Sequence, residues 1–220
     1  MRTPDYERAA VKAMETLIKY NITTAPVIPL PIFKRTPGVL VLTYAEVSNL
    51  SGLNRSDLIR LCGEENQDAV TAVHSDGSGL KYIVTYNQRL PIYMVQRSLA
   101  RELGHIILGH DGSRPDEVRR AEALCFANHL LCPRPLIRAV QKAGVKLTAE
   151  VLGNMTGCYE RCLLIMRGTP GTHVPAELNR KVKAQFAEYL SNFLNFQKIL
   201  SINDQSALAD FGTYMEGYEE

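Results

Sequence analysis

The 220-residue chain contains no apolar run near the ~20 residues that a membrane-spanning helix requires. Its N-terminus is polar and charged, without the apolar segment of an export signal. Its cysteines form no Cys-x-x-Cys pair of the zinc-ribbon type, so we interpret them as small core residues. These absences favour a protein of a reducing cytoplasm without membrane contact. The five cysteines are Cys62, Cys125, Cys132, Cys158 and Cys162.

A strong net charge is also absent, but the total of +2 hides an uneven distribution. Residues 133–187 carry nine Lys/Arg and three Glu, whereas residues 188–220 carry one Lys and six acidic residues. A basic segment can bind the phosphates of nucleic acid, or it can be a helical packing segment with solvated charges. DNA therefore remains a possible partner of the basic segment.

One histidine is missing from an otherwise complete metal-binding pattern. In His-Glu-x-x-His, two histidines on one helix face bind zinc, and the glutamate acts as general base on the zinc-bound water. The segment Arg101 to His105 reads Arg-Glu-Leu-Gly-His, so Glu102 and His105 are present while Arg101 stands at the first position. A guanidinium has no lone pair to give a metal. The segment therefore predicts the scaffold of such a site without its complete ligand set.

The segments around this pattern predict helices packed on a small sheet. Two β-rich runs within Asp68–Asn87 flank a Ser-Asp-Gly-Ser-Gly turn, which is a hairpin signal. Gln96–His110 and Ala121–Pro133 show helical spacing of apolar residues, and the proline ends the second helix. Further expected elements are a helix over Thr3–Tyr20 with Thr3 as N-cap, a proline-rich extended connector over 25–38, a strand over Val39–Thr43, and helices over Asn54–Cys62 and Ala176–Leu200.

This order of elements resembles the ImmA/IrrE family of bacterial and phage metallopeptidase-like proteins. The resemblance implies an α+β, zincin-like fold, in which a small sheet with a hairpin packs on the motif helices and the C-terminal part is helical. It also implies that Glu102 is the catalytic base and His105 a metal ligand. The matching positions are Tyr86, Asn87, Arg97, Ala100, Glu102 to His105, Leu108 to His110, Ala123, Phe126, Ala127, Leu130, Leu131 and Pro133.

The chain departs from this family at the expected zinc ligands. The resemblance places the third ligand, a glutamate, where Arg120 stands, and a polar group that would orient a ligand where Leu124 stands. Glu122, Cys125 and His129 fall on a helix stripe opposite Arg120 and are interpreted as a polar, solvated or partly buried face. His110, five residues after His105, is expected to face elsewhere. We therefore expect no cofactor, with zinc bound only if the motif site still functions.

Two arginines at ligand positions also predict what replaces the metal. If the family geometry holds, Arg101 and Arg120 point into one cleft, where guanidiniums repel each other unless carboxylates or an anion lie between them. The candidate carboxylates within the chain are those of Glu102, Asp116 and Glu117. We expect either an arginine–carboxylate cluster or a bound anion or acidic substrate group at Arg101 and Arg120.

The predicted domains are a metallopeptidase-like domain over 1–133, a basic helical region over 134–203 and an acidic tail over 204–220. Within the helical region, Leu147 to Arg161 resembles the helix-turn-helix-like segment of the family. Three functions stay open: a non-catalytic regulatory or binding protein of a bacterium or mobile element, an active zinc metallopeptidase that cleaves a repressor-type regulator, and a DNA-binding regulator acting through 133–187. The first implies a protein or peptide partner.

Overall fold

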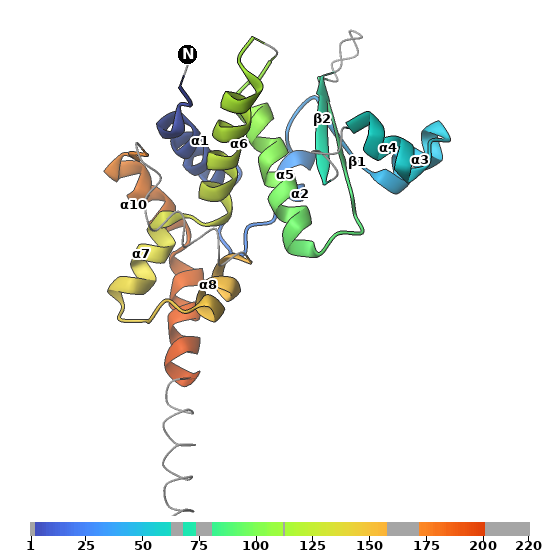
Figure 1. The fold of residues 1–220 in the computed structure, drawn as a ribbon. Helices are drawn as coiled ribbons and strands as arrows, with labels where there is room; N and C mark the ends of the chain where they lie inside the picture. The colour runs from blue at the N-terminus through green and yellow to red at the C-terminus, as the bar shows by residue number, and fades with distance from the viewer. Residues whose placement is uncertain (1–2, 63–67, 74–80, 112, 158–171, 201–220) are drawn as a thin grey trace, which may run out of the picture.

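The computed structural model describes residues 3–62, 68–73, 81–111, 113–157 and 172–200. A three-stranded sheet lies at one side of the molecule, and most of the helices gather on the other (Figure 1). The predicted α+β, zincin-like fold with a small sheet is confirmed. The elements are α1 (Tyr6–Lys19), α2 (Leu30–Lys34), β1 (Val39–Thr43), α3 (Tyr44–Ser51), α4 (Arg55–Cys62), β2 (Ala69–Val73), β3 (Tyr82–Tyr86), α5 (Ile92–Ile107), α6 (Asp116–Leu131), α7 (Arg134–Lys142), α8 (Ala149–Thr156) and α10 (Ala176–Gln185).

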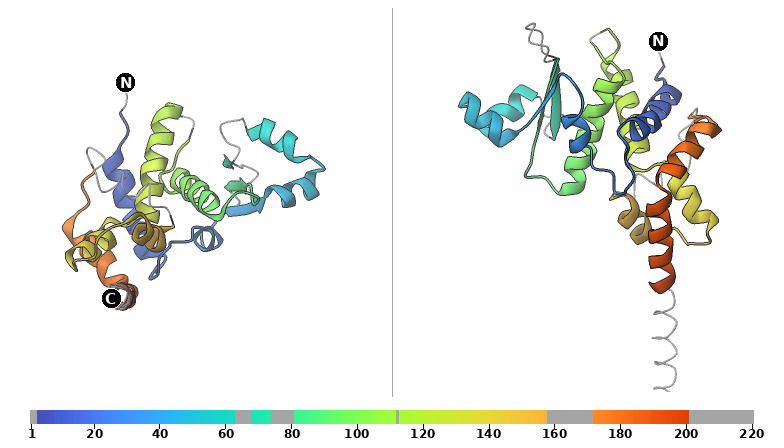
Figure 2. Two further views of the ribbon diagram at one scale, coloured as in Figure 1. Left: turned by 60° about the horizontal axis from the view of Figure 1, so that its bottom comes forward. Right: turned by 180° about the vertical axis from the view of Figure 1, so that it is seen from behind.

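The sheet has the strand order β1-β3-β2, with β1 parallel and β2 antiparallel to β3. Val84 of the central strand pairs with Val41 on one side and Thr71 on the other, and its side chain is fully buried. The predicted hairpin is thus confirmed as β2 and β3, while its turn lies outside the described residues. Helix α5 packs against β2 and β3 (Figure 2). Its residue Glu102 accepts a hydrogen bond from Thr71 of β2.

Helices α5 and α6 approach closely because a glycine lies between them. A Cβ atom on Gly104 would lie 3.0 Å from the carbonyl oxygen of Ala123 and 3.1 Å from Cδ1 of Phe126, closer than such atoms normally pack. The contact is continued by Leu103, Phe126 and Leu130, which are fully buried. This glycine therefore sets the spacing of the two helices that carry the motif residues.

Three predicted helix limits were wrong by several residues. Helix α1 begins after Asp5 and not at Thr3, because the Asp5 carboxylate accepts a hydrogen bond from the N–H of Arg8 at 2.9 Å. Helix α6 begins at Asp116, five residues before the predicted start. Helix α5 ends at Ile107, short of the predicted His110, because the chain turns through Gly109 at φ +64°.

Two helices were not predicted. The proline-rich connector contains α2, with Pro31 in the first helical turn, where a missing N–H costs nothing. Directly after β1, helix α3 begins with a capping box: Thr43 accepts from the N–H of Glu46, and the Glu46 carboxylate accepts from the N–H of Thr43. It ends at Gly52 in the left-handed region. Both helices had local sequence signals, Pro31 for α2 and the Thr43–Glu46 capping box for α3. The prolines of the connector and the strand pattern of 39–43 concealed them.

The C-terminal helices pack against α1. Helix α10 contacts α1 and α7, and Gln185 Nε2 donates to the carbonyl oxygens of Leu17 at 2.8 Å and Ile22 at 2.6 Å. The single helix predicted over Ala176–Leu200 is interrupted by a turn at Phe186 and resumes over 187–200. Of the helix-turn-helix-like segment only α8 is described; residues 158–161 and the acidic tail lie outside the described part. No helix among the described residues is long and apolar enough to cross a membrane.

Candidate functional site

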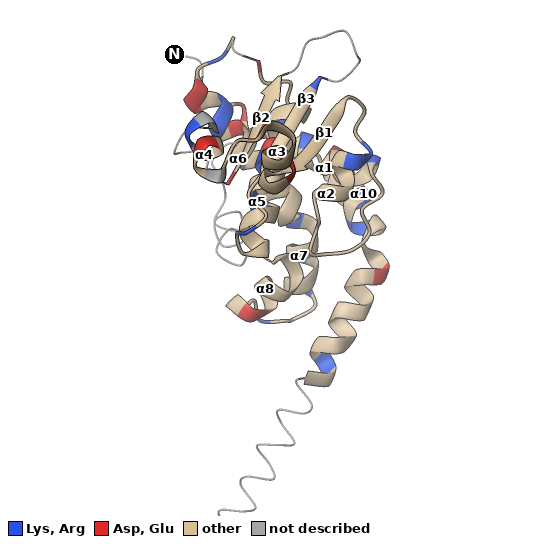
Figure 3. Cartoon of the chain, turned by 90° about the vertical axis from the view of Figure 1, so that its right-hand side faces the viewer, with Lys and Arg blue, Asp and Glu red and all other residues tan. Residues whose placement is uncertain are grey.

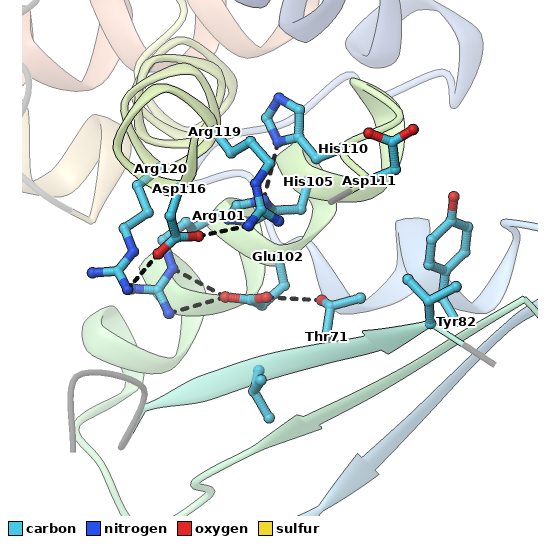
Figure 4. Close-up of a pocket in the computed structure, with 12 residues that line it drawn as sticks. Thr71, Tyr82, Arg101, Glu102, His105, His110, Asp111, Asp116, Arg119 and Arg120 are labelled. Atoms are coloured by element: carbon cyan, nitrogen blue, oxygen red, sulfur yellow. Dashed lines mark hydrogen bonds and ion pairs between the residues drawn. The ribbon is translucent and has the colours of Figure 1, made fainter. Parts of the chain in front are cut away.

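A pocket of about 250 Å³ lies between β2, α5 and the first turns of α6 (Figure 4). Strand β2 contributes Thr71, and helix α5 contributes Arg101, Glu102 and His105. The loop after α5 and helix α6 close it with His110, Asp116, Arg119 and Arg120. We name it the arginine pocket, because it is lined by three guanidiniums. It brings together the four predicted site residues Arg101, Glu102, His105 and Arg120.

Glu102 lies at the base of the pocket and is only 4% exposed. Its Oε2 accepts a hydrogen bond from Thr71 Oγ1 at 2.8 Å, and its Oε1 accepts from Arg101 Nε at 3.0 Å. Burial raises the pKa of Glu102 above its ordinary value, although Arg101 and Thr71 act in the opposite direction. The carboxylate is thus held by two side chains but remains poorly solvated.

Arg101 is folded back onto the glutamate that follows it. Its Nη2 lies 2.9 Å from Glu102 Oε1, in addition to the bond from Nε, and donates to the carbonyl oxygen of Ala69 in β2 at 3.1 Å. The side chain at the first motif position therefore neutralises the carboxylate that would act as general base.

His105 and His110 contact each other, so the expectation that His110 faces elsewhere was wrong. Their Nδ1 atoms are 3.0 Å apart, because Gly109 turns the chain after α5 and the N–H of His110 donates to the carbonyl oxygen of His105. His110 Nε2 lies 2.9 Å from the Glu122 carboxylate. If His110 Nε2 donates its proton to the Glu122 carboxylate, His110 Nδ1 is unprotonated and accepts a hydrogen bond from His105 Nδ1. The free lone pair of His105 is then on its Nε2 atom. Burial, His110 and Arg101 lower the pKa of His105 to about 4.

Glu122 is fully buried on the opposite side of α6, whereas the prediction there was a polar face, either solvated or partly buried. Its oxygens accept from the N–H of Asp5 at 2.8 Å, from Arg114 Nη1 at 2.7 and 3.0 Å, and from His110. We call this group the Glu122 cluster. Burial alone would raise the pKa of Glu122, but Asp5, His110 and Arg114 outweigh it and lower the pKa. The cluster joins α6, the start of α1 and the loop between α5 and α6.

Cys125 and His129 continue the same buried stripe. His129 Nδ1 lies 3.0 Å from the carbonyl oxygen of Cys125, and burial raises the pKa of the Cys125 thiol to about 12. Cys132 is buried and disulfide-bonded, so its interpretation as a plain core residue was incomplete. The side chains of Cys62, Cys158 and Cys162 lie outside the described part. Because disulfides are rare in a reducing compartment, the cytoplasmic location stays a prediction.

Arg119 was not predicted as a site residue, although it lies beside Arg120 at the rim. The carboxylate of Asp116 bridges the two arginines: Oδ1 lies 2.8 Å from Arg119 Nη2, and Oδ2 lies 2.6 Å from Arg120 Nη2. The spacing of Asp116, three and four residues before the arginines on one helix, was the available signal. The Arg101–Glu102 and Asp116 ion pairs together form an arginine–carboxylate cluster in the cleft (Figure 4). Glu117 does not line the pocket.

The donor set of the pocket does not fit zinc. Catalytic zinc needs three protein ligands, and guanidiniums stand at two of the expected positions. His105 offers one lone pair, and the Glu102 carboxylate is already bound by Arg101 and Thr71. Among the described residues no group of three His, Cys, Asp or Glu side chains is placed to hold a metal ion.

Most of the described basic side chains of the region lie on two helices, α7 and α10. Arg134 and Arg138 lie on α7, and Lys181 pairs with Glu177 on α10 at 2.8 Å. The following helix carries acidic Glu188 near its start and basic Lys198 near its end (Figure 3). DNA binding through 133–187 therefore stays a prediction.

Comparison with known proteins supports the fold through one match. Residues 59–154 match the family model of the IrrE N-terminal-like domain, a metallopeptidase family. This stretch spans β2, β3, α5 and α6 and so includes every residue of the arginine pocket. No curated protein and no solved structure matches the chain significantly.

Proposed function

Because residues 59–154 form an ImmA/IrrE-like domain, we propose that this chain is a zinc-free, non-catalytic member of that family with a regulatory or binding role. The observation that carries the proposal is the ion pair of Arg101 with Glu102. The Nε and Nη2 atoms of Arg101 lie 3.0 and 2.9 Å from Oε1 of Glu102. Arg101, which stands at the first ligand position, thus forms an ion pair with the carboxylate that would act as general base.

Peptide hydrolysis in this scaffold requires a metal-activated water and a free carboxylate to take its proton. Arg101 removes both, because it supplies no lone pair and holds Glu102 as an ion pair. At the third ligand position Arg120 bonds to Asp116 at 2.6 Å, which places another cation beside the cleft. Positive charge near a dication is costly in a partly buried site.

Metal analysis of protein purified without chelator tests the proposal directly. We expect less than stoichiometric zinc and no binding at His105 in a zinc titration followed by the histidine resonances. Stoichiometric zinc with three protein ligands beside His105 would overturn the proposal and favour the alternative, an active peptidase.

A repair experiment tests whether ligand loss alone silences the site. The double variant Arg101→His, Arg120→Glu restores two histidines and a carboxylate, so we expect it to bind zinc measurably, whereas each single variant binds little. The single variants are the matched controls, because each leaves fewer than three ligands. A double variant that folds but binds no zinc would show that α5 and α6 are not disposed as in the family.

A further inference from the structure

We propose that the arginine pocket is a binding site for a carboxylate, and that Asp116 fills it until a ligand displaces it. The inference rests on the proposed function, since a site that held zinc would not keep three arginines around it. It names the chemical class of ligand that the pocket recognises: a planar carboxylate of an acidic side chain or of a peptide C-terminus.

The Asp116 carboxylate already shows the binding geometry. Its two oxygens bridge the guanidiniums of Arg119 and Arg120 at 2.8 and 2.6 Å, an arrangement that places one carboxylate between two arginine forks. The Asp116 side chain is nevertheless 53% exposed and belongs to the first residue of α6. A rotation about its side-chain bonds can carry it into water without moving the helix, so an incoming carboxylate can take its place.

A second observation indicates that the hydrogen-bonding groups of Arg119 are not all satisfied. Within the described part of the chain, Nε of Arg119 is buried and has no hydrogen-bond acceptor. A buried donor without an acceptor destabilises the structure, and a ligand oxygen that reaches it would relieve this cost. Asp116 pairs with Nη2 of Arg119, and Nε of the same guanidinium is left as a donor without an acceptor among the described residues.

The other two carboxylates of the lining, those of Glu102 and Asp111, are bound by neighbouring groups. The Glu102 carboxylate is paired with Arg101, and His105 contributes no negative charge. Asp111 lies at the rim, exposed, where its carboxylate accepts from the N–H of Ser113 at 2.9 Å. A volume of about 250 Å³ leaves space for a small acidic group above Glu102.

Binding of three small probes to the full chain tests the inference by isothermal titration and histidine NMR shifts. N-acetylglycine offers a terminal carboxylate, the α-amide of N-acetylglutamic acid offers a side-chain carboxylate, and N-acetylglycinamide is the neutral control. We expect one or both acids to bind in the millimolar range and the neutral amide not to bind. Which acid binds more tightly distinguishes an acidic side chain from a peptide terminus.

Two variants identify the residues involved. Asp116→Asn removes the internal carboxylate, so we expect acid binding to tighten about fivefold, the equivalent of an exposed ion pair. Arg119→Gln should abolish binding; its fold is checked by urea unfolding, and Arg120→Gln serves as the second arginine variant. Glu177→Gln is the matched control for Asp116→Asn, because Glu177 also forms an i,i+4 ion pair on a helix, with Lys181, but lies outside the pocket.

The outcomes separate this inference from the proposed function. If wild type and Asp116→Asn bind neither acid and no zinc, or if binding survives both arginine variants, the carboxylate site is wrong while the zinc-free assignment stands. If the same protein binds zinc at His105, the proposed function fails as well. Acid binding that Asp116→Asn tightens and Arg119→Gln removes supports both.

Discussion

Two buried glutamates lie on neighbouring helices, and their surroundings shift their pKa values in opposite directions. Glu102 on α5 is 4% exposed and its pKa is raised, whereas Glu122 on α6 is fully buried and its pKa is lowered. Burial raises the pKa of both groups; it prevails at Glu102, whereas at Glu122 the donors outweigh it. The comparison separates a carboxylate at the base of the arginine pocket from one that joins segments of the fold.

The donors explain the opposite shifts. Glu122 accepts from a backbone N–H at the start of α1, and from an imidazole and a guanidinium of the loop between α5 and α6. Glu102 accepts from the adjacent Arg101 and from Thr71. Glu122 thus joins two distant segments to α6, whereas Glu102 makes one distant contact, with Thr71 of β2, and is otherwise paired with its neighbour in sequence. We therefore assign a structural role to Glu122.

The largest effect expected from this comparison is a loss of stability in Glu122→Gln. The amide cannot pair with Arg114 as a carboxylate does, and a buried donor is left unsatisfied, so the free energy of unfolding should fall by about 3 kcal/mol. Urea unfolding measures it. Glu177→Gln, which removes one partner of an exposed ion pair, is the control and should cost no more than about 0.5 kcal/mol.

Glu102→Gln provides the other half of the same comparison. Removing a poorly solvated charge offsets the loss of the Arg101 pair, so the variant should differ from wild type by less than about 1 kcal/mol. The assignment of distinct roles would be wrong if both glutamine variants lost equal stability.

The pH dependence of stability should separate the two residues by sign. Because the pKa of Glu122 is lowered in the folded protein, its contribution is present above the unfolded value of 4.5 and is lost as the pH falls through the folded pKa. Glu102 has a raised pKa, so its contribution is present below 4.5 and is lost as the pH rises through its folded pKa.

Urea unfolding of wild type and both glutamine variants between pH 3 and 7 measures these contributions. The cost of Glu122→Gln should shrink on acidification, and Glu102→Gln should become more stable relative to wild type as the pH rises. Parallel curves for the two variants would contradict the opposite pKa shifts.

The same contrast marks how far the sequence could predict the site. Glu102, His105 and Arg101 follow from one helical segment whose spacing fixes their relative positions, and β1 and the hairpin follow from local alternation. The partners of Glu122 could not be predicted in this way. Asp5 and Arg114 contact Glu122 only because α1 and the loop between α5 and α6 pack against α6. His110 was misplaced because a helical extrapolation from His105 fails at Gly109, where φ is +64°. Local periodicity carries no information on such a turn.

The smallest effect concerns the hydroxyl that holds Glu102. Thr71 Oγ1 lies 2.8 Å from Glu102 Oε2 on the edge strand β2. Thr71→Val keeps the branched shape and suits a strand, and water in the pocket can replace the lost donor. The free energy of unfolding should therefore change by less than about 1 kcal/mol.

The pKa of Glu102 should rise further in Thr71→Val, because the hydroxyl stabilises the ionised form. NMR titration of the Glu102 carboxyl carbon measures this shift, and Thr71→Ser, which keeps the donor, should leave it near the wild-type value. A lower pKa in Thr71→Val would reverse the assignment of donor and acceptor. Glu102 would then be the protonated partner that donates to Thr71, and Arg101 would face a neutral acid in place of an ion pair.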